Sequence, residues 1–385
     1  GQFRVWTGPL FPAYLTSGPA LTVFSALIKV VTGLSGSVAG RLTSFSYYIG
    51  CWFLLIGMVR LQSKKWSRDQ LLVGSLVVIG FFHIQWRGLQ DNFYYPFAIL
   101  GEQAMIFWIL LATWAHLRGN VLLSGIASGL ALLSKPYVVF LVPIWVLILA
   151  FHRETRKSAL RYLLGVFFPW SLWVGWMVCT MGPVGALQYW LRYPEAIRLA
   201  GNPGMLSEGV PLSVRIAIVP EILNRKGMLA FAVGIFSALW LGRKLRAFLP
   251  LTVFAFFHLA WWFWKAPTPS PRYFVPVYLI FCLANVLILL KQLDRVPFPK
   301  QLGFAMRSSL IFALIAPLLI RVVPEVNRIL SDRESYGFTR QLILQREWEK
   351  MDPRPTQFLS VAQVDYAHEV DTLMVGPHTI QRVAI

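Results

Sequence analysis

Apolar runs of about 14 to 20 residues recur along most of the 385-residue chain, and each is bounded by Lys, Arg, Pro or Gly. A helix of this length matches the hydrocarbon core of a bilayer. Charged residues make up only 14% of the chain, whereas soluble domains contain about 25%. The pattern predicts an all-α fold, a polytopic bundle of transmembrane helices.

The apolar runs divide the chain into three parts. Residues 1–41 are expected to form an outer loop, residues 42–322 the transmembrane bundle, and residues 323–385 a small extracytoplasmic tail. The ten predicted spans are 42–59, 71–86, 99–117, 121–134, 136–151, 162–181, 227–242, 247–264, 273–290 and 308–322.

The segments between the spans alternate in charge, and this alternation orients the molecule. One set is short and basic, and the positive-inside rule places it in the cytoplasm. The other set is longer or rich in Pro and aromatic residues, so we expect it to face outward. Ten spans that start outside also end outside, which makes the tail extracytoplasmic, and its segment "TRQLILQREWEK" is expected to be helical. The basic segments are "RLQSKKWSR", "HLRGN", "HRETRK", "GRKLR" and "KQLDRVPFPK", and the outer ones are residues 1–41, 87–98, 182–226, 265–272 and the tail.

Two segments leave the number of spans open. Residues 120–151 can be one long span, but both flanks are basic, so parity favours two short spans with Lys135 and Pro136 at the outer turn. In the first outer loop, "GPALTVFSALIKVVTGLSG" is apolar but interrupted by Lys29 and glycines. This favours a helix lying in the outer interface. The alternative is an eleventh short span, which the basic loops argue against.

The net charge of +19 is unevenly distributed, since the first 320 residues contain eight acidic and 28 basic residues. Much of this excess lies in short loops, where it sets membrane topology, so nucleic acid is not expected as a partner. Cys51, Cys179 and Cys282 lie in or beside apolar runs without paired spacing, which indicates buried thiols. The six histidines are dispersed, and no metal site is predicted.

Glu102 is the one carboxylate in the apolar stretch "FAILGEQAMIFWILLATWA". An ionisable group inside a membrane costs about 2.5 to 3.5 kcal/mol on insertion scales, and such a group often marks a functional site. Glu102 can instead be structural, because the first helical turn places it at the positive end of the helix dipole. Asp91 flanks the same short loop, so these two are the candidate catalytic acids. The other outer acids, Glu195, Glu208 and Glu221, are expected to be surface charges.

Basic residues on the outer side oppose the positive-inside rule. Arg272 and Tyr273 begin the ninth span in "PRYFVPVYLIF", behind the Pro-rich turn "KAPTPSP". Arg can bind a phosphate through two parallel hydrogen bonds, and Lys adds a point charge. The outer bases are therefore candidate ligands for the phosphate of a lipid carrier, with contact to ordinary headgroups as the alternative. They are Arg41, Arg87, Lys135, Lys265 and Arg272.

Two further motifs have structural explanations. The segment "WWFWK" at residues 261–265 can stack on sugar rings, but at the end of a span it is typical of the aromatic belt. Gly125 and Gly129 lie four residues apart inside a span, a spacing typical of close helix packing.

Four segments, in order along the chain, resemble landmarks of the integral-membrane GT-C glycosyltransferases. They are "YLTSGPALTVFSALIKVVTGLSG" followed by Arg41, "LGEQAMIFWILLATWAHLRGN", "SGIASGLALLSKPYVVFLVPI" and "SPRYFVPVYLIF". The most similar groups include the protein O-mannosyltransferases and the bacterial aminoarabinose and lipopolysaccharide-core sugar transferases. The resemblance covers residues 12–290 and implies a GT-C-like bundle in the bacterial cytoplasmic (inner) membrane.

This resemblance implies transfer of a sugar from a polyprenyl-phosphate carrier to a lipid, glycan or protein acceptor on the outer face of the membrane. It places Glu102 or Asp91 at the position of an acid in the second outer loop, and Lys135, Arg272 and Tyr273 near the donor phosphate. It leaves a divalent metal open, and no other cofactor is expected. The expected partners are membrane lipid, the lipid-linked sugar donor and, as a further alternative, other membrane subunits.

In the family, a first span and an acidic motif precede the segment that corresponds to "TGPLFPAYLTSGP", so we expect the native protein to extend upstream. Without that motif, the resemblance implies a noncatalytic subunit of the same fold in a larger membrane complex. A third alternative is a transporter that uses Glu102 as a coupling carboxylate. The sequence shows no inverted repeat, which argues against a transporter.

Overall fold

The computed structural model describes residues 19–33, 36–63, 65–89, 101–151, 156–200, 211–266, 271–293, 295, 303–313, 357–360, 372–375 and 378–382. Its helices are α1 Pro19–Thr32, α2 Gly36–Gln62, α3 Arg68–Trp86, α4 Gly101–Leu117, α5 Val121–Ser134, α6 Leu141–Phe151, α7 Arg156–Ala200, α9 Leu212–Ile222, α10 Arg225–Lys244, α11 Leu249–Trp264 and α12 Pro271–Leu293. Two 3-10 turns, η2 Pro136–Val138 and η4 Arg246–Phe248, and a helix Phe304–Ala313 also belong to the helical part.

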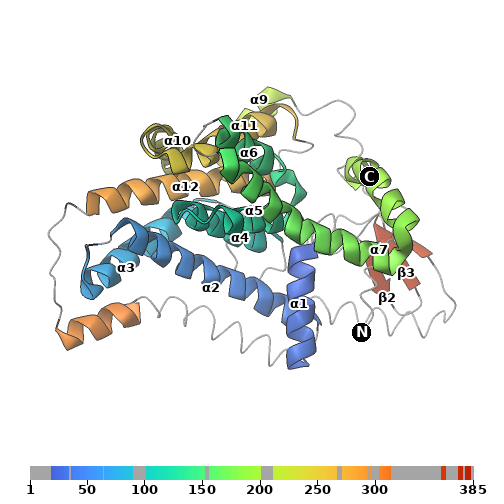
Figure 1. Ribbon diagram of the computed structural model, residues 1–385, viewed down its shortest axis with the longest axis horizontal. Coiled ribbons are helices and arrows are strands. Elements are labelled where there is room, and N and C mark those ends of the chain that lie inside the picture. Colours follow the sequence, from blue (N-terminus) through green and yellow to red (C-terminus); the bar gives the residue numbers. More distant parts are fainter. Residues whose placement is uncertain are drawn as a thin grey trace.

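Every predicted span coincides with a helix (Figure 1), although the last one is described only as far as residue 313. Within the described residues, six helices are long and apolar enough to cross a bilayer: α2, α3, the first part of α7, α10, α11 and α12. The helices α5, α6 and Phe304–Ala313 are shorter and apolar. The protein is therefore a multi-pass membrane protein, as the sequence predicts.

The centre of the bundle is α12. In the most apolar stretch of α12, 83% of the residues are buried inside the protein. In the corresponding stretches of the other five long helices, between 28% and 44% are buried. A helix that is apolar all round is expected in a core position. Figure 1 shows α12 running through the middle, with α2 and α3 on one side and α10, α11 and α6 on the other.

Polar contacts connect α12 to its neighbours. The Asn285 side chain donates to Gln85 Oε1 at 2.7 Å and to the Ala230 carbonyl at 2.9 Å, which links α12 to α3 and α10. The Tyr278 hydroxyl donates to the Gln85 carbonyl near the end of α3. Hydrogen bonds of this kind satisfy buried polar groups that would otherwise be costly in an apolar interior.

The segment 120–151 forms two short antiparallel helices, as predicted. The helix α5 ends at Ser134, Lys135 caps it in an extended conformation, and η2 leads into α6. The ring of Trp145 on α6 stacks on Tyr162 near the start of α7 and contacts His116 at the end of α4. Because α6 thus returns to the end where α4 finishes, the chain reverses direction at Lys135.

Side-chain contacts also fix the direction of α2 relative to α4. Phe107 on α4 lies against Gly50 on α2, and seven residues further along both helices Trp114 lies against Gly57. The two helices are therefore parallel, with their first turns at the same end of the bundle. The starts of α4 and α12 and the end of α5 also lie there, and we call this the Glu102 end.

The end of α3 and the start of α10 meet at the Glu102 end. Asn224 donates from its backbone to the Gly88 carbonyl at 2.9 Å and from its side chain to the Arg87 carbonyl at 2.9 Å. The same side chain caps α10 by accepting from the backbone of Lys226 and Gly227. The end of α3, the starts of α9 and α10 and the end of α11, which border predicted outer connections, thus share one end of the bundle.

The predicted interfacial helix corresponds to α1, and Figure 1 shows it crossing the start of α2 at a steep angle. Its Phe24 contacts Tyr47 on α2 and Trp108 on α4, with ring centroids 5.9 and 6.0 Å away. Its 14 residues give a length of about 21 Å, less than the bilayer core. Both features agree with a helix that lies along the interface rather than crossing the membrane.

Local signals define the start of α3 and attach the last described helix to it. Ser67 and Gln70 form a reciprocal capping box, with Ser67 Oγ accepting from Gln70 N and Gln70 Oε1 accepting from Ser67 N. Asp69 in the same first turn binds Arg307 in a bidentate ion pair, with both N–O distances 2.7 Å. This pair joins helix Phe304–Ala313 to the beginning of α3.

The helix α7 breaks at Gly182, whose φ of 73° and ψ of 164° are not helical. The chain then turns back far enough for Trp190 to contact Trp170, with ring centroids 5.4 Å apart. The prediction of buried thiols is confirmed for Cys51 and Cys282 but is wrong for Cys179. Cys179 is exposed because this part of α7 is packed on one side only.

The fold is all-α, as predicted, apart from a small sheet in the tail that the sequence analysis did not predict. Strands β1 Gln357–Ser360, β2 Thr372–Val375 and β3 His378–Arg382 are ordered β1-β3-β2, with β1 parallel and β2 antiparallel to β3. Runs of four or five residues carry too little periodicity to be recognised as strands. The predicted helix "TRQLILQREWEK" lies outside the described residues.

Candidate functional site

Glu102, which is predicted inside a span, and Lys135, which is predicted at an outer turn, form an ion pair. Lys135 Nζ lies 3.0 Å from Glu102 Oε1, and the two side chains are only 3% and 1% exposed. They meet because α4 and α5 form an antiparallel hairpin, which turns through Gly119 at a φ of 77°. This hairpin brings the first turn of α4 to the last residues of α5.

Helix dipoles contribute to the stability of both charges. Glu102 lies in the first turn of α4, where the dipole is positive, and Lys135 is the C-cap of α5, where the dipole is negative. Each such placement stabilises a charge by about 0.3 to 1 kcal/mol, and by more when it is partly buried. Together with the direct attraction, the dipoles offset the cost of holding two charges in an apolar bundle.

The carboxylate of Glu102 retains an unused acceptor. Glu102 Oε2 is buried and has no hydrogen-bond partner among the described residues. A carboxylate oxygen in this situation can accept a hydrogen bond from water, a hydroxyl or an amine. The pair therefore has the chemistry to receive a polar group at its carboxylate side.

Aromatic residues next to the pair connect it to the start of α12. Tyr137 in η2, two residues after Lys135, contacts the ring of Tyr273 edge-on, with centroids 5.0 Å apart. His258 Nε2 lies 2.9 Å from the Tyr273 carbonyl. The Trp261 ring lies 5.8 Å from that of Tyr273. These contacts hold the first turn of α12 beside the Lys135 turn.

The structure thus brings together three of the predicted site residues, Glu102, Lys135 and Tyr273. Arg272 directly precedes Tyr273 in the first turn of α12, but its side chain lies outside the described part of the structure. Arg41 is buried near the start of α2, and because α2 and α4 are parallel it lies at the same end of the bundle.

The remaining outer charges do not join this cluster within the described structure. Arg87 and Lys265 are exposed at the ends of α3 and α11. Glu221 is exposed on α9, in agreement with the expected surface charge. Asp91, Glu208 and the side chain of Glu195 lie outside the described residues.

Arg215 on α9 is a buried cation that the sequence analysis missed. Its guanidinium donates to the carbonyls of Trp262 and Ala266, both at 2.6 Å, and only 2% of the residue is exposed. Burial lowers the pKa of this guanidinium from its ordinary value, although arginine remains protonated in proteins. The contact caps the C-terminal end of α11 with a positive charge, which the helix dipole favours.

Tyr137 and His258 were missed as well, although each has a signal in the sequence. Tyr137 follows Lys135 and Pro136 directly in "SKPY", and His258 is the one ionisable residue between Pro250 and Trp264. Within the described part of the chain, no group of three His, Cys, Asp or Glu residues could hold a metal ion.

Comparisons with known proteins give a weak structural likeness. No family model matches the chain, and no curated protein matches it. The crystal structure of ArnT from Cupriavidus metallidurans bound to undecaprenyl phosphate is similar, with a TM-score of 0.47 and 14% identity over 94% of this chain and 74% of that chain. A similarity of this strength does not transfer an activity or a residue role to this chain.

Proposed function

We propose that this chain is a membrane glycosyltransferase that moves a sugar from a polyprenyl-phosphate carrier to a lipid, glycan or protein acceptor. The observation that supports this most directly is the buried Glu102–Lys135 pair beside the first turn of α12. Ionisable residues are retained inside a membrane bundle at a cost, and they commonly mark a substrate site. Here an acid, an amine and a tyrosine meet at one end, next to Arg272.

The proposed reaction assigns a role to each charge. A hydroxyl or amino group of the acceptor attacks the anomeric carbon of the sugar, and the bond from that carbon to the phosphate oxygen breaks. The acceptor's proton passes to a carboxylate, for which Glu102 and Asp91 are the candidates. Lys135 and Arg272 stabilise the negative charge that develops on the departing carrier phosphate.

Arg41 and Tyr273 are assigned to binding of the carrier. Arg41 is a buried cation at the same end of the bundle, and Tyr273 is held in place by Tyr137 and His258. In this assignment the Glu102 end faces away from the cytoplasm, and the protein resides in a bacterial cytoplasmic membrane. The basic connections at the opposite end support that orientation through the positive-inside rule.

The test is transfer from a polyprenyl-phosphate-linked sugar by the purified protein in lipid vesicles. Glu102→Gln and Arg272→Ala should each abolish transfer per unit of folded, membrane-inserted protein. Arg87→Ala, which removes an exposed cation from the same end, should retain it. Wild-type activity in Glu102→Gln or Arg272→Ala would refute the role of that residue.

A noncatalytic subunit of the same fold is a second candidate, favoured by the degree to which the pair is buried. With 1% and 3% exposure, Glu102 and Lys135 neutralise each other as a structural ion pair would. In that case wild-type protein binds no donor and transfers no sugar, and Glu102→Gln affects only stability. A donor-binding measurement on wild-type protein separates the two candidates.

A further inference from the structure

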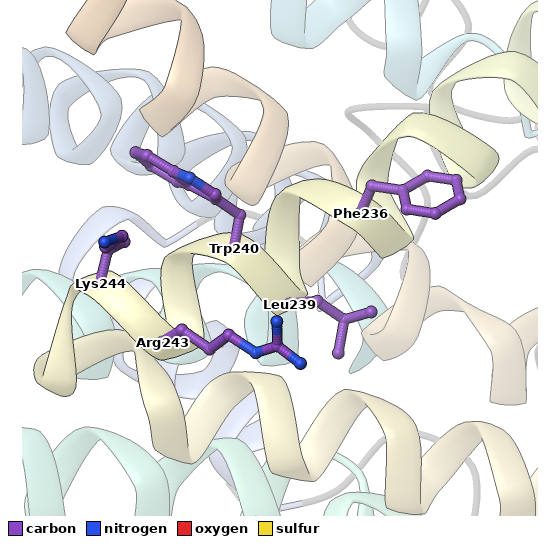
Figure 2. Close-up of a pocket in the computed structure, with 5 residues that line it drawn as sticks. All are labelled: Phe236, Leu239, Trp240, Arg243 and Lys244. Carbon is purple, nitrogen blue, oxygen red and sulfur yellow. The ribbon is translucent and has the colours of Figure 1, made fainter.

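An open groove lies on α10, at the end of the bundle opposite Glu102. Its volume is about 480 Å³, and Phe236, Leu239, Trp240, Arg243 and Lys244 line it. We call it the α10 groove. Figure 2 shows all five side chains projecting from α10, with the Arg243 guanidinium extending along the helix in the direction of Leu239.

The lining residues change from apolar to cationic along one face of the helix. Phe236 is 74% exposed, Leu239 is 41% exposed and Trp240 is 39% exposed, while Arg243 and Lys244 occupy the last turn. Between Phe236 and Arg243 the helix rises by about 10 Å. This is the distance over which a bilayer changes from acyl chains to headgroups, so the groove presents each chemistry at a matching depth.

The cations of the groove are available for an external anion. Neither Arg243 nor Lys244 has an ion-pair or hydrogen-bond partner among the described residues, and the lining contains no acidic residue. Lys291 on α12 adds a third positive charge, with its Nζ 4.6 Å from the centre of the Trp240 ring. This cation–π contact ties the Trp240 ring to the adjacent helix and places an ammonium at the edge of the groove.

General features of membrane proteins explain part of this arrangement. Cations in the last turn of a helix interact favourably with its dipole, and basic residues accumulate at cytoplasmic boundaries. A transmembrane helix also exposes apolar side chains to bulk lipid. None of these effects requires a groove with cations at one end of that apolar face, or a further cation held over an indole ring. A ligand with an anionic head and apolar chains accounts for both parts of the groove.

We propose that the α10 groove binds one anionic phospholipid, with its phosphate between Arg243, Lys244 and Lys291 and its acyl chains along Phe236 and Leu239. Binding at this groove is separate from the sugar-transfer function proposed for the Glu102 end. It would anchor the ends of α10 and α12 to the leaflet that borders them.

The test uses the full chain in nanodiscs that contain phosphatidylglycerol and phosphatidylcholine with identical acyl chains. After release from the nanodisc, native mass spectrometry measures the ratio of the two lipids that stay bound. We expect wild-type protein to retain phosphatidylglycerol at several times its bulk fraction. Arg243→Gln combined with Lys244→Gln should remove most of that enrichment and return the ratio of the two lipids to about its bulk value.

The matched control is Arg156→Gln combined with Lys157→Gln. These two adjacent residues are also exposed cations at the same end of the bundle, but they belong to the first turn of α7. The proposal predicts little change in this control, and an equal loss in both double variants would overturn it by showing a general charge effect. Wild-type protein with no preference for phosphatidylglycerol would also overturn it, whether or not the variants fold.

Discussion

Lys135 and Glu102 form an ion pair across the α4–α5 hairpin, with almost no exposure to solvent. Removing one member of such a pair affects stability differently from removing both. Removing one partner leaves an uncompensated buried charge, whereas replacing both partners with neutral side chains removes the desolvation cost together with the attraction. The geometry therefore makes a prediction about stability that is independent of any catalytic role.

Glu102→Gln and Lys135→Met should each lower the free energy of unfolding by about 3 kcal/mol or more, because each leaves the other charge buried. The double variant should lose much less than the sum. Denaturant unfolding in detergent micelles measures this coupling through a double-mutant cycle. Additive effects of the two substitutions would show that the pair does not act as a unit.

The helices of the predicted spans could be recognised because each is an apolar run with a charged or Pro-containing boundary. Helix α9 was not predicted, because it lies in the segment 182–226 that was assigned to an outer loop. Pro136 and the basic flanks of residues 120–151 were sufficient to predict two short helices there, and the structure shows α5 and α6. The sequence analysis predicted a span over residues 162–181 followed by a loop, and it did not predict that the helix breaks at Gly182 and then continues. It depends on one backbone conformation, which leaves no periodic signal. The short strands of the tail were missed because four or five residues do not establish a period.

The candidate site could be predicted only as a set of unusual residues. Glu102 was identified as the one carboxylate in a predicted span and Lys135 as a base at an outer turn, but their pairing depends on the register of the α4–α5 hairpin. Arg215 was missed because it lies in a loop with many charges, and its partners are backbone carbonyls distant in sequence. The position of Asp91 stays a prediction, since it lies outside the described residues.

The close packing predicted for Gly125 and Gly129 is confirmed, and it gives a second prediction. A Cβ at Gly125 would overlap the Tyr162 carbonyl oxygen on α7, and one at Gly129 would lie 2.7 Å from the Val166 carbonyl oxygen. Gly125→Ala should therefore separate α5 from α7 and destabilise the protein by about 1 to 3 kcal/mol. Thermal unfolding in detergent measures the change.

Gly80→Ala on α3 is the control for this substitution, because no atom lies within 4 Å of the added Cβ. Alanine has the higher helix propensity, so this variant should be neutral or slightly more stable. If Gly125→Ala behaved like Gly80→Ala, the two helices would not be in backbone contact in the membrane.

The Arg215 cap on α11 gives a third prediction. Arg215→Met should lose two charge-assisted hydrogen bonds, each of a kind that contributes about 1.5 to 3 kcal/mol. The end of α11 should then exchange its amide hydrogens faster, and hydrogen-exchange mass spectrometry of residues 261–266 measures this. Arg225→Met removes an exposed arginine from the start of α10 and should leave the exchange unchanged. Equal protection in both variants would argue against the cap.

The kink in α7 gives the last prediction. Gly182 has a φ of 73° and a ψ of 164°, a region that is accessible almost only to glycine. No atom lies within 4 Å of a Cβ added there, so Gly182→Ala should cost about 1 to 3 kcal/mol through backbone strain alone. Gly175→Ala, in the helical part of α7 and equally free of contacts, should be neutral or stabilising. Because the two substitutions add the same methyl group, their difference in unfolding free energy isolates the backbone conformation. A difference near zero would mean that the helix does not break at Gly182.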